Sequence, residues 1–168
     1  MQTHIYVASR DQRIAGVADR PGLCDAMDGI RFFRDFSRAE IEALSGFVER
    51  YTIPAGEALL IEGERAPGLY FLVPGRVRLD KRDDKDVQKP LAVVRPGSVL
   101  GEVSMIDRQP VSATAIAIEP VDIVLLPADK LDRLCRQRQG LAIRLIWALA
   151  RELSARLRKT SGSLITHL

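Results

Sequence analysis

The chain has 168 residues, of which 46% are hydrophobic and 28% charged, a composition typical of one globular domain with a sizeable core. Its net charge of +3 is too small for the whole surface to act as an electrostatic DNA-binding face. No apolar run approaches the length of a membrane span, and the N-terminus lacks a signal-peptide pattern. We therefore expect a cytoplasmic protein in which Cys24 and Cys135 are free, buried thiols.

Residues 1–29 have the least regular pattern in the chain. Residues 4–8 have the composition of a short strand, but glycines and a proline interrupt the segment from residue 16 to residue 29. We interpret residues 1–29 as an N-terminal arm that packs on the rest of the chain, and a segment that docks a partner or a ligand is the alternative. Residues 30–168 are expected to form a single domain.

A helix is expected to begin after Ser37. The sequence from Ser37 to Glu40 is a capping box, in which the serine hydroxyl and the glutamate carboxylate each accept a hydrogen bond from the other residue's backbone N–H. Apolar residues then recur at helical spacing, at Ile41, Leu44, Phe47 and Val48. The spacing therefore predicts a helix that continues to Val48.

Between residues 51 and 127, short apolar runs alternate with glycine and proline about every ten residues. The apolar runs are residues 51–53, 58–61, 69–73, 77–79, 91–94, 99–100, 113–118 and 121–126. Roughly eight short strands at this spacing are typical of a β-sandwich or a jelly roll. The charged run at residues 82–86 is interpreted as the solvated tip of a hairpin.

Gly101 and Glu102 begin the most informative segment. We expect them to open a one-turn helix with Val103 and Ile106 on its apolar side, which Pro110 ends. A glycine lets the backbone approach a ligand, the helix N-terminus attracts an anion, and Glu102 can accept a sugar hydroxyl. The segment could therefore hold a phosphate and a ribose together. For Gly-Glu alone, a plain turn with a surface carboxylate is the simpler interpretation.

Residues 101–114 resemble the phosphate-binding cassette of the cyclic nucleotide-binding domain, a family that includes catabolite activators, kinase regulatory subunits and gated channels. Gly101 and Glu102 match the family's Gly-Glu pair, in which the glutamate binds ribose. Ser112 and Ala113 match the end of its Arg-Ser/Thr-Ala triplet. The turn glycines and the run 69–73 also resemble the family's barrel, so the resemblance covers about residues 32–159.

The resemblance implies an α+β, mainly β fold: a cyclic nucleotide-binding-like jelly-roll barrel with an N-terminal helix and a long C-terminal helix. Val111 departs from the family pattern, because it stands where the family has its phosphate-binding arginine. Leaving a buried charge without its partner typically costs about 2–5 kcal/mol, or roughly thirtyfold to several thousandfold in affinity. Arg108 is close enough in sequence to be a replacement cation.

Three outcomes compete for the ligand: weak binding of cAMP or cGMP, binding of a cyclic dinucleotide such as cyclic di-GMP held by helix arginines, or no ligand. The candidate ligand-binding residues are Gly101, Glu102, Val103, Ser104, Arg108, Val111, Ser112, Ala113 and Arg156. No metal site and no cofactor is expected, because the sequence has no run of metal ligands.

Two helices are expected after the strands. Asp129 is a plausible N-cap for a helix over residues 130–138 that Gly140 ends, and a longer helix of about 30 Å follows over about 141–161. Its first half is apolar nearly all round, which predicts burial on two sides. Its second half has a narrow seam, which predicts a homodimer, as the family also implies, with packing on the barrel as the alternative. The seam residues are Leu149, Leu153 and Leu157.

No enzyme class is indicated. His4 and His167 stand at the two ends, and no nucleophile elbow or P-loop spacing is present. DNA binding is not expected either, because too few residues follow Ser161 for the helix-turn-helix domain of the family's transcription factors. The sequence therefore predicts a stand-alone sensor that signals to a protein partner. The alternative is a ligand-free dimeric scaffold that retains the fold.

Overall fold

The computed structural model describes residues 20–165, so the expected strand at residues 4–8 lies outside the described residues, as do His4 and His167. Among the described residues, 20–131 form one compact unit and 132–165 form a second. Within the described part of the first unit, two four-stranded antiparallel sheets are accompanied by short helices. The fold class predicted from the sequence, a mainly β jelly roll with flanking helices, is confirmed.

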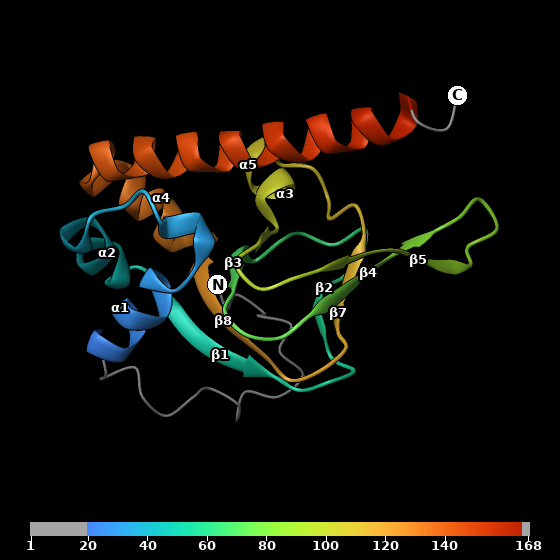
Figure 1. Ribbon diagram of the computed structural model, residues 1–168, viewed down its shortest axis with the longest axis horizontal. Helices are drawn as coiled ribbons and strands as arrows, with labels where there is room; N and C mark the ends of the chain where they lie inside the picture. The colour runs from blue at the N-terminus through green and yellow to red at the C-terminus, as the bar shows by residue number, and fades with distance from the viewer. Residues whose placement is uncertain (1–19, 166–168) are drawn as a thin grey trace. The chain divides into compact units, whose positions relative to one another are not determined.

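Three short helices precede the strands and lie together beside strand β1 (Figure 1). They are α1 (Arg20–Asp28), the 3-10 helix η2 (Arg31–Phe33) and α2 (Arg38–Ser45). The capping box is confirmed, because the Ser37 backbone N–H donates to Glu40 Oε2 at 2.7 Å and the Glu40 N–H donates to Ser37 Oγ at 3.3 Å. Helix α1 falls inside the expected arm, and the division at residue 29 stays a prediction.

Helix α2 ends earlier than predicted. Gly46 is its C-cap, so Phe47 and Val48 lie beyond the helix although both are buried. These two apolar residues lead into β1 (Glu49–Ile53). The predicted extension to Val48 was therefore wrong, because buried residues continue from the helix into the strand without a break in hydrophobicity.

An aromatic cluster joins this helical segment to the sheet. The Phe32 and Phe33 rings contact Phe71 on the third strand, with ring centroids 5.0 and 4.8 Å from that of Phe71. Phe36 packs on both of them. Such aromatic pairs add stabilisation beyond their buried area. The cluster therefore covers the face of β3 opposite the barrel interior.

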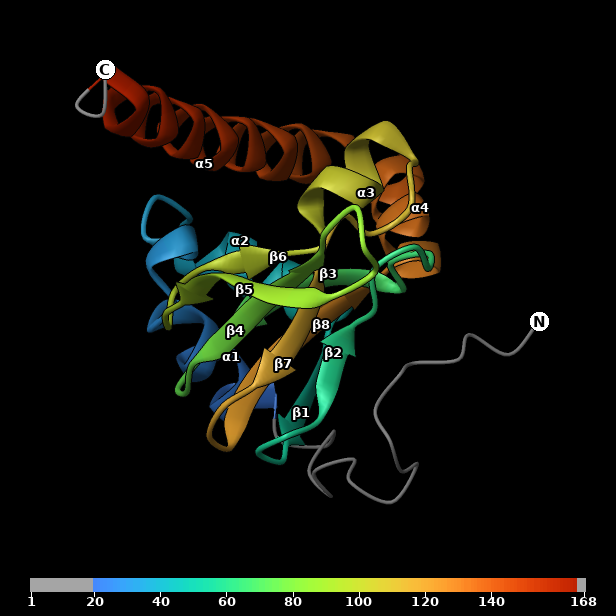
Figure 2. The same ribbon diagram turned by 90° about the vertical axis from the view of Figure 1, so that its right-hand side faces the viewer.

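The eight strands lie between the turns that the glycines and prolines of the sequence predict. After β1 come β2 (Ala58–Leu60), β3 (Gly68–Leu72), β4 (Val77–Arg82), β5 (Gln88–Val94), β6 (Val99–Leu100), β7 (Thr114–Ala117) and β8 (Val121–Pro127). One sheet has the order β1-β8-β3-β6 and the other β2-β7-β4-β5. Figure 2 shows the second sheet in front of the first.

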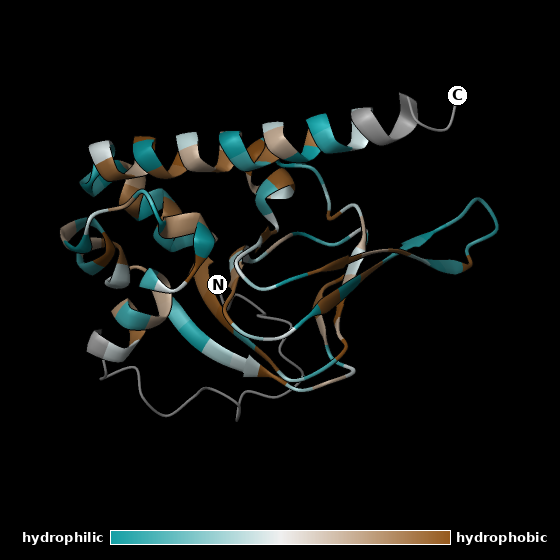
Figure 3. Cartoon of the chain, viewed as in Figure 1, coloured by the Kyte–Doolittle hydropathy of each residue, from teal (hydrophilic) through white to brown (hydrophobic). Residues whose placement is uncertain are grey.

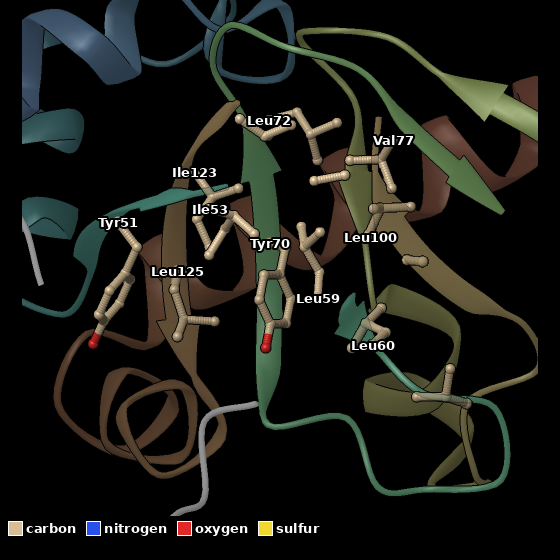
Figure 4. Packing of buried hydrophobic residues seen from close by; sticks show 14 residues of the cluster. Tyr51, Ile53, Leu59, Leu60, Tyr70, Leu72, Val77, Leu100, Ile123 and Leu125 are labelled. Atoms are coloured by element: carbon tan, nitrogen blue, oxygen red, sulfur yellow. The ribbon is translucent and has the colours of Figure 1, made fainter. Parts of the chain in front are cut away.

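The hydrophobic core of the barrel lies between the two sheets (Figure 4). Alternation along β3 places Tyr70 and Leu72 in this core, beside Leu59 from β2 and Leu100 from β6. The hydropathy colouring in Figure 3 shows hydrophobic strand segments here and a hydrophilic tip where β4 turns into β5. The predicted polar hairpin tip at residues 82–86 therefore has its place between these strands.

The second unit contains the end of helix α4 (Ala128–Gln137) and helix α5 (Gln139–Ile165). Asp129 lies inside the first turn of α4 and is not its N-cap, and Gly140 belongs to α5 and does not end the preceding helix. Both predicted boundaries were therefore wrong. None of the helices within residues 20–165 is both long enough and apolar enough to cross a lipid bilayer.

The exposure of α5 side chains differs from the prediction. Ile143, Ile146 and Trp147 are 56%, 50% and 64% exposed, so the first half of this helix is not buried on two sides in the single chain. In the predicted seam, Leu149 is buried whereas Leu157 is exposed. The apolar residues all round the helix thus include a face that is open in the single chain.

Both cysteines are free, as predicted. Cys24 is buried but Cys135 is exposed, so the expectation of two buried thiols holds for Cys24 alone.

Candidate functional site

The segment 101–114 connects the two sheets. It leaves β6, which pairs with β3 in the first sheet, and it enters β7, which pairs with β2 and β4 in the second. Its two ends are therefore held by different layers of the barrel, and its single helix, α3 (Glu102–Asp107), lies between them.

Gly101 occupies a position that strongly favours glycine. Its φ of +82° lies in the left-handed region, and a Cβ there would stand 2.6 Å from the Gly68 carbonyl oxygen on β3. The close approach fixes the direction in which the chain leaves β6. Steric contact with β3 therefore explains why a glycine stands at the start of the predicted cassette.

Glu102 follows as the first residue of α3 and is only 2% exposed. Burying a carboxylate costs desolvation energy that its hydrogen-bonding partners must offset. Val103 and Ile106, expected on the apolar side of this turn, are instead exposed, and Ser104 is half-buried. The buried side of α3 is thus the side of Glu102, and the predicted apolar face was wrong.

Helix α3 ends before Pro110. Its last turn closes with a hydrogen bond from the Arg108 N–H to the Ser104 carbonyl oxygen at 3.0 Å, and Arg108 adopts a left-handed conformation with φ +60°. The backbone reverses at this residue, so Pro110 follows the stop and does not cause it. The Arg108 side chain is exposed.

Val111 belongs to the barrel core. Its side chain is 6% exposed and packs in the buried cluster between the sheets. Its N–H donates to the Glu64 carbonyl oxygen at 2.8 Å, and its carbonyl accepts the Gly63 N–H at 2.9 Å. The residue that stands in the arginine's place is therefore an apolar core residue clamped by two backbone hydrogen bonds.

The connection between β2 and β3 borders both ends of the cassette. Gly63 and Glu64 pair with Val111, and a Cβ on Gly101 would lie 3.8 Å from the Ala66 Cβ. The Gly-Glu end and the Ser-Ala end thus border the same loop, although Val111 comes ten positions after Gly101 in the sequence.

Ser112 and Ala113 complete the cassette before β7. Ser112 is exposed and Ala113 half-buried, and the Lys81 ammonium group donates to the Ser112 carbonyl oxygen at 2.7 Å. Thr114, the first residue of β7, accepts the Glu62 N–H on its hydroxyl at 3.1 Å. Neither Lys81 nor Glu62 was among the residues predicted from the sequence.

The hydrophobic pattern of β4 gives no signal for Lys81. Val77 and Leu79 point inward at a spacing of two, but a bulge between Leu79 and Asp80 breaks this period, so Asp80 is buried and Lys81 is exposed. In the sequence, Lys81 therefore looks like part of the solvated charged run at residues 82–86. Arg156, which was predicted as a cation together with Arg108, is an exposed residue of α5 in the second unit.

The barrel interior contains one buried hydroxyl without a partner among the described residues. Tyr70 on β3 is fully buried, and its hydroxyl makes no hydrogen bond within residues 20–165. Burial, together with the neighbouring Tyr51, raises the pKa of Tyr70 well above its usual range. Figure 4 shows both tyrosine rings in the cluster, with their hydroxyl groups at the same end.

The groups at the cassette are suited to hydrogen bonding and charge pairing. A buried carboxylate, a serine hydroxyl, backbone amides and one ammonium group can together bind a polar, anionic molecule. Among the described residues, no three His, Cys, Asp or Glu side chains are grouped as metal ligands.

Two curated bacterial relatives match most of the chain. The cyclic AMP receptor protein of Thermus thermophilus is 28% identical over 76% of this chain and 59% of its own length. The CRP-like cAMP-activated global transcriptional regulator of Mycobacterium tuberculosis H37Rv is 28% identical over 79% of this chain and 57% of its own. The chain therefore spans somewhat more than half the length of these relatives.

A solved structure has the same fold over nearly the whole chain. The crystal structure of a cyclic nucleotide-binding domain from Methylobacillus flagellatus superposes with a TM-score of 0.77 at 28% identity, covering 90% of this chain and 85% of that one. The sequence model of the cyclic nucleotide-binding domain matches residues 50–138, more than half of the 168 residues. The chain therefore belongs to the cyclic nucleotide-binding domain family.

Proposed function

We propose that this chain is a regulatory module that senses a nucleotide second messenger at residues 101–114. The observation that carries the proposal is Glu102, a carboxylate 2% exposed that directly follows a glycine forced by its contact with β3. A buried carboxylate is costly for stability alone, and in the family this position binds ribose. Family membership and this local geometry support the same function.

The proposed ligand is a cyclic mononucleotide, cAMP or cGMP. Gly101, Glu102, Val103 and Ser104 would meet its ribose and phosphate from one end of the cassette, and Ser112 and Ala113 would do so from the other. Val111 adds no charge, so the loss of about 2–5 kcal/mol expected for an absent cation applies unless another residue offsets it. Cyclic di-GMP, with Arg156 as an additional cation, is the alternative ligand.

We propose that the module forms a homodimer through α5. The exposed Ile143 and Leu157 lie two heptads apart, and Ile146 and Leu153 lie one heptad apart, which is the repeat of a coiled-coil seam. This face keeps Leu153 and Leu157 of the predicted seam and leaves out Leu149, which is buried.

Light scattering coupled to size exclusion tests the dimer. Ile146→Glu should give a monomer, because it places a charge in the seam, whereas the matched control Ile118→Glu, at an exposed isoleucine before β8, should leave the dimer intact. A dimer that survives Ile146→Glu would contradict this interface.

We propose that the module has no catalytic activity, acts in the cytoplasm and signals through a protein partner. Ligand binding would change the surface that the dimer presents, by favouring one of two conformations with different affinity for the ligand. DNA is not among the proposed partners, because the charge of +3 gives no extended basic face.

A ligand-free dimeric scaffold is the second candidate. The observation that favours it is the side chain of Val111, which packs in the barrel core instead of offering a charge to a phosphate. A domain that had lost its ligand while keeping its dimer interface could have an apolar residue at this position.

Ligand-dependent melting of wild type and Glu102→Ala separates the two candidates. Ligand at about 100 times its Kd stabilises a protein by about 2.7 kcal/mol, so the wild type should melt higher with cAMP or cGMP. Glu102→Ala should lose most of that shift, whereas Glu119→Ala, at a carboxylate paired with Arg76, should keep it. If no nucleotide shifts the wild type, the scaffold is favoured.

A further inference from the structure

Lys81 reaches the cassette from a different strand. Its ammonium nitrogen lies 2.7 Å from the Ser112 carbonyl oxygen, a contact between residues 31 apart in sequence. The side chain is 51% exposed, so its end is accessible to a dissolved ligand. An ammonium group therefore stands next to the residues that match the family's Ser-Ala pair.

The pairing of β4 with β7 holds Lys81 in this place. Leu79 is opposite Ala115 and Asp80 is opposite Thr114, so Lys81 lies one step further, where β7 begins and the cassette ends. Asp80 is itself fixed by two hydrogen bonds from Arg78, at 2.7 and 2.8 Å. On the other side of the strand, Lys81 is opposite Lys89 of β5, so the backbone that carries Lys81 lies between two paired strands.

The ammonium group keeps capacity for an anion. It has three N–H donors, and the contact with the Ser112 carbonyl uses one of them. Glu62 is its nearest carboxylate, with Oε1 at 3.7 Å, which is too long for a hydrogen bond. The other oxygen of Glu62 accepts the Arg82 N–H at 2.9 Å. Glu62 therefore forms a loose ion pair with Lys81 but accepts no hydrogen bond from it.

We propose that Lys81 supplies the phosphate-binding cation that Val111 does not. The inference rests on the proposed function. The ligand would carry a phosphate diester, and the Lys81 ammonium group on β4 would pair with its negative charge. A flexible ammonium group on a four-carbon stem pairs with phosphate as a point charge, in place of the planar fork of an arginine.

Arg108 is the competing cation, and its backbone makes it the weaker one. It closes helix α3 in a left-handed conformation, and its side chain is exposed. Lys81, in contrast, already contacts a cassette residue. The two assignments make opposite predictions for substitution.

Calorimetric titration with cAMP and cGMP, at two salt concentrations, tests the assignment in the full chain. The variants are Lys81→Met, Lys81→Arg, Arg108→Gln and the control Lys89→Met, at a lysine that pairs with Asp83 at 2.7 Å. Lys81→Met should raise the Kd by about tenfold to a hundredfold and flatten its dependence on salt. Lys81→Arg should stay close to wild type, and so should Arg108→Gln and Lys89→Met.

The outcomes separate the two proposals. If the wild type binds and Lys81→Met binds equally well with the same salt dependence, the role of Lys81 is overturned while the nucleotide site stands. If Arg108→Gln weakens binding and Lys81→Met does not, the cation is Arg108. If the wild type binds neither nucleotide, the proposed ligand and the role of Lys81 both fall. Circular dichroism of each variant confirms that the barrel is intact.

Discussion

Tyr70→Phe should stabilise the protein, because the Tyr70 hydroxyl is buried without a partner among residues 20–165. A buried polar group without a hydrogen bond costs about 1–3 kcal/mol, and the phenylalanine ring fills the same space. We expect the free energy of unfolding to rise by about 1–2 kcal/mol. For a chain of this size, that raises the melting temperature by about 2–8 °C.

Tyr51→Phe is the matched control in the same cluster. The Tyr51 hydroxyl donates to the Glu49 carboxylate, which also accepts a hydrogen bond from Lys130 at 2.6 Å. Removing this charge-assisted bond should lower the free energy of unfolding by about 1–2 kcal/mol. The two substitutions delete the same atom from two rings of one cluster and are expected to act with opposite sign.

Alkaline pH gives an independent readout on Tyr70. Burial raises the pKa of its hydroxyl, so the folded state retains a proton that the unfolded chain loses near pH 10. This contribution is present below about pH 10 and is lost as pH rises further. Tyr70→Phe should reduce the alkaline loss. Chemical denaturation at neutral and alkaline pH measures both effects, and a Tyr70→Phe protein less stable than wild type at neutral pH would refute the reasoning.

Three further predictions concern the cassette and the strand beside it. Gly101→Ala should lower the free energy of unfolding by about 2–4 kcal/mol, because the new Cβ meets a backbone oxygen of β3 at φ +82°; a melting temperature equal to wild type would contradict this. Val111→Arg should destabilise the free protein by about 2–4 kcal/mol, because it buries an unpaired charge, yet it should tighten cAMP binding about thirtyfold or more. Thermal melting measures the first effect and calorimetric titration the second. Unchanged affinity in a folded variant would show that position 111 is not part of the phosphate site. Asp80 accepts two hydrogen bonds from Arg78 that lower the pKa of its carboxyl group, so its contribution to stability is present above about pH 4 and is lost as pH falls. Asp80→Asn should therefore weaken the loss of stability in acid. A free energy of unfolding that falls with pH just as in the wild type would contradict this role of Asp80.

Much of the fold was predictable because local signals agree with it. The capping box at Ser37 and the Gly/Pro punctuation each specify structure within a few residues. The end of α2 at Ser45 was missed because Phe47 and Val48 continue the hydrophobic pattern into β1. Hydrophobicity alone does not show whether a buried residue belongs to a helix or to the strand that follows it.

The cassette was predictable as a segment, whereas its surroundings were not. Gly101, Glu102, Ser112 and Ala113 are contiguous pairs that a motif can identify. Lys81 reaches Ser112 only because β4 pairs with β7, and this pairing between distant segments is set by the tertiary fold. The exposure of Val103 was likewise missed, because the short helix α3 turns the side of Glu102 inward.

The exposed face of α5 shows the same limit. Leu149 and Ile143 are both apolar and lie on one helix, yet the first is buried and the second exposed. A helix that is apolar nearly all round does not reveal which face its own chain covers. The sequence could therefore assign the proposed dimer interface to this helix but not to one face of it.

The central claim is that residues 101–114 bind a cyclic nucleotide, and calorimetric titration of the wild-type protein with cAMP, cGMP and cyclic di-GMP tests it most directly. We predict saturable binding of a cyclic mononucleotide with a Kd that Glu102→Ala raises about tenfold or more. No heat with any of the three ligands, together with an unchanged melting temperature, would contradict the claim and leave the dimeric scaffold as the function.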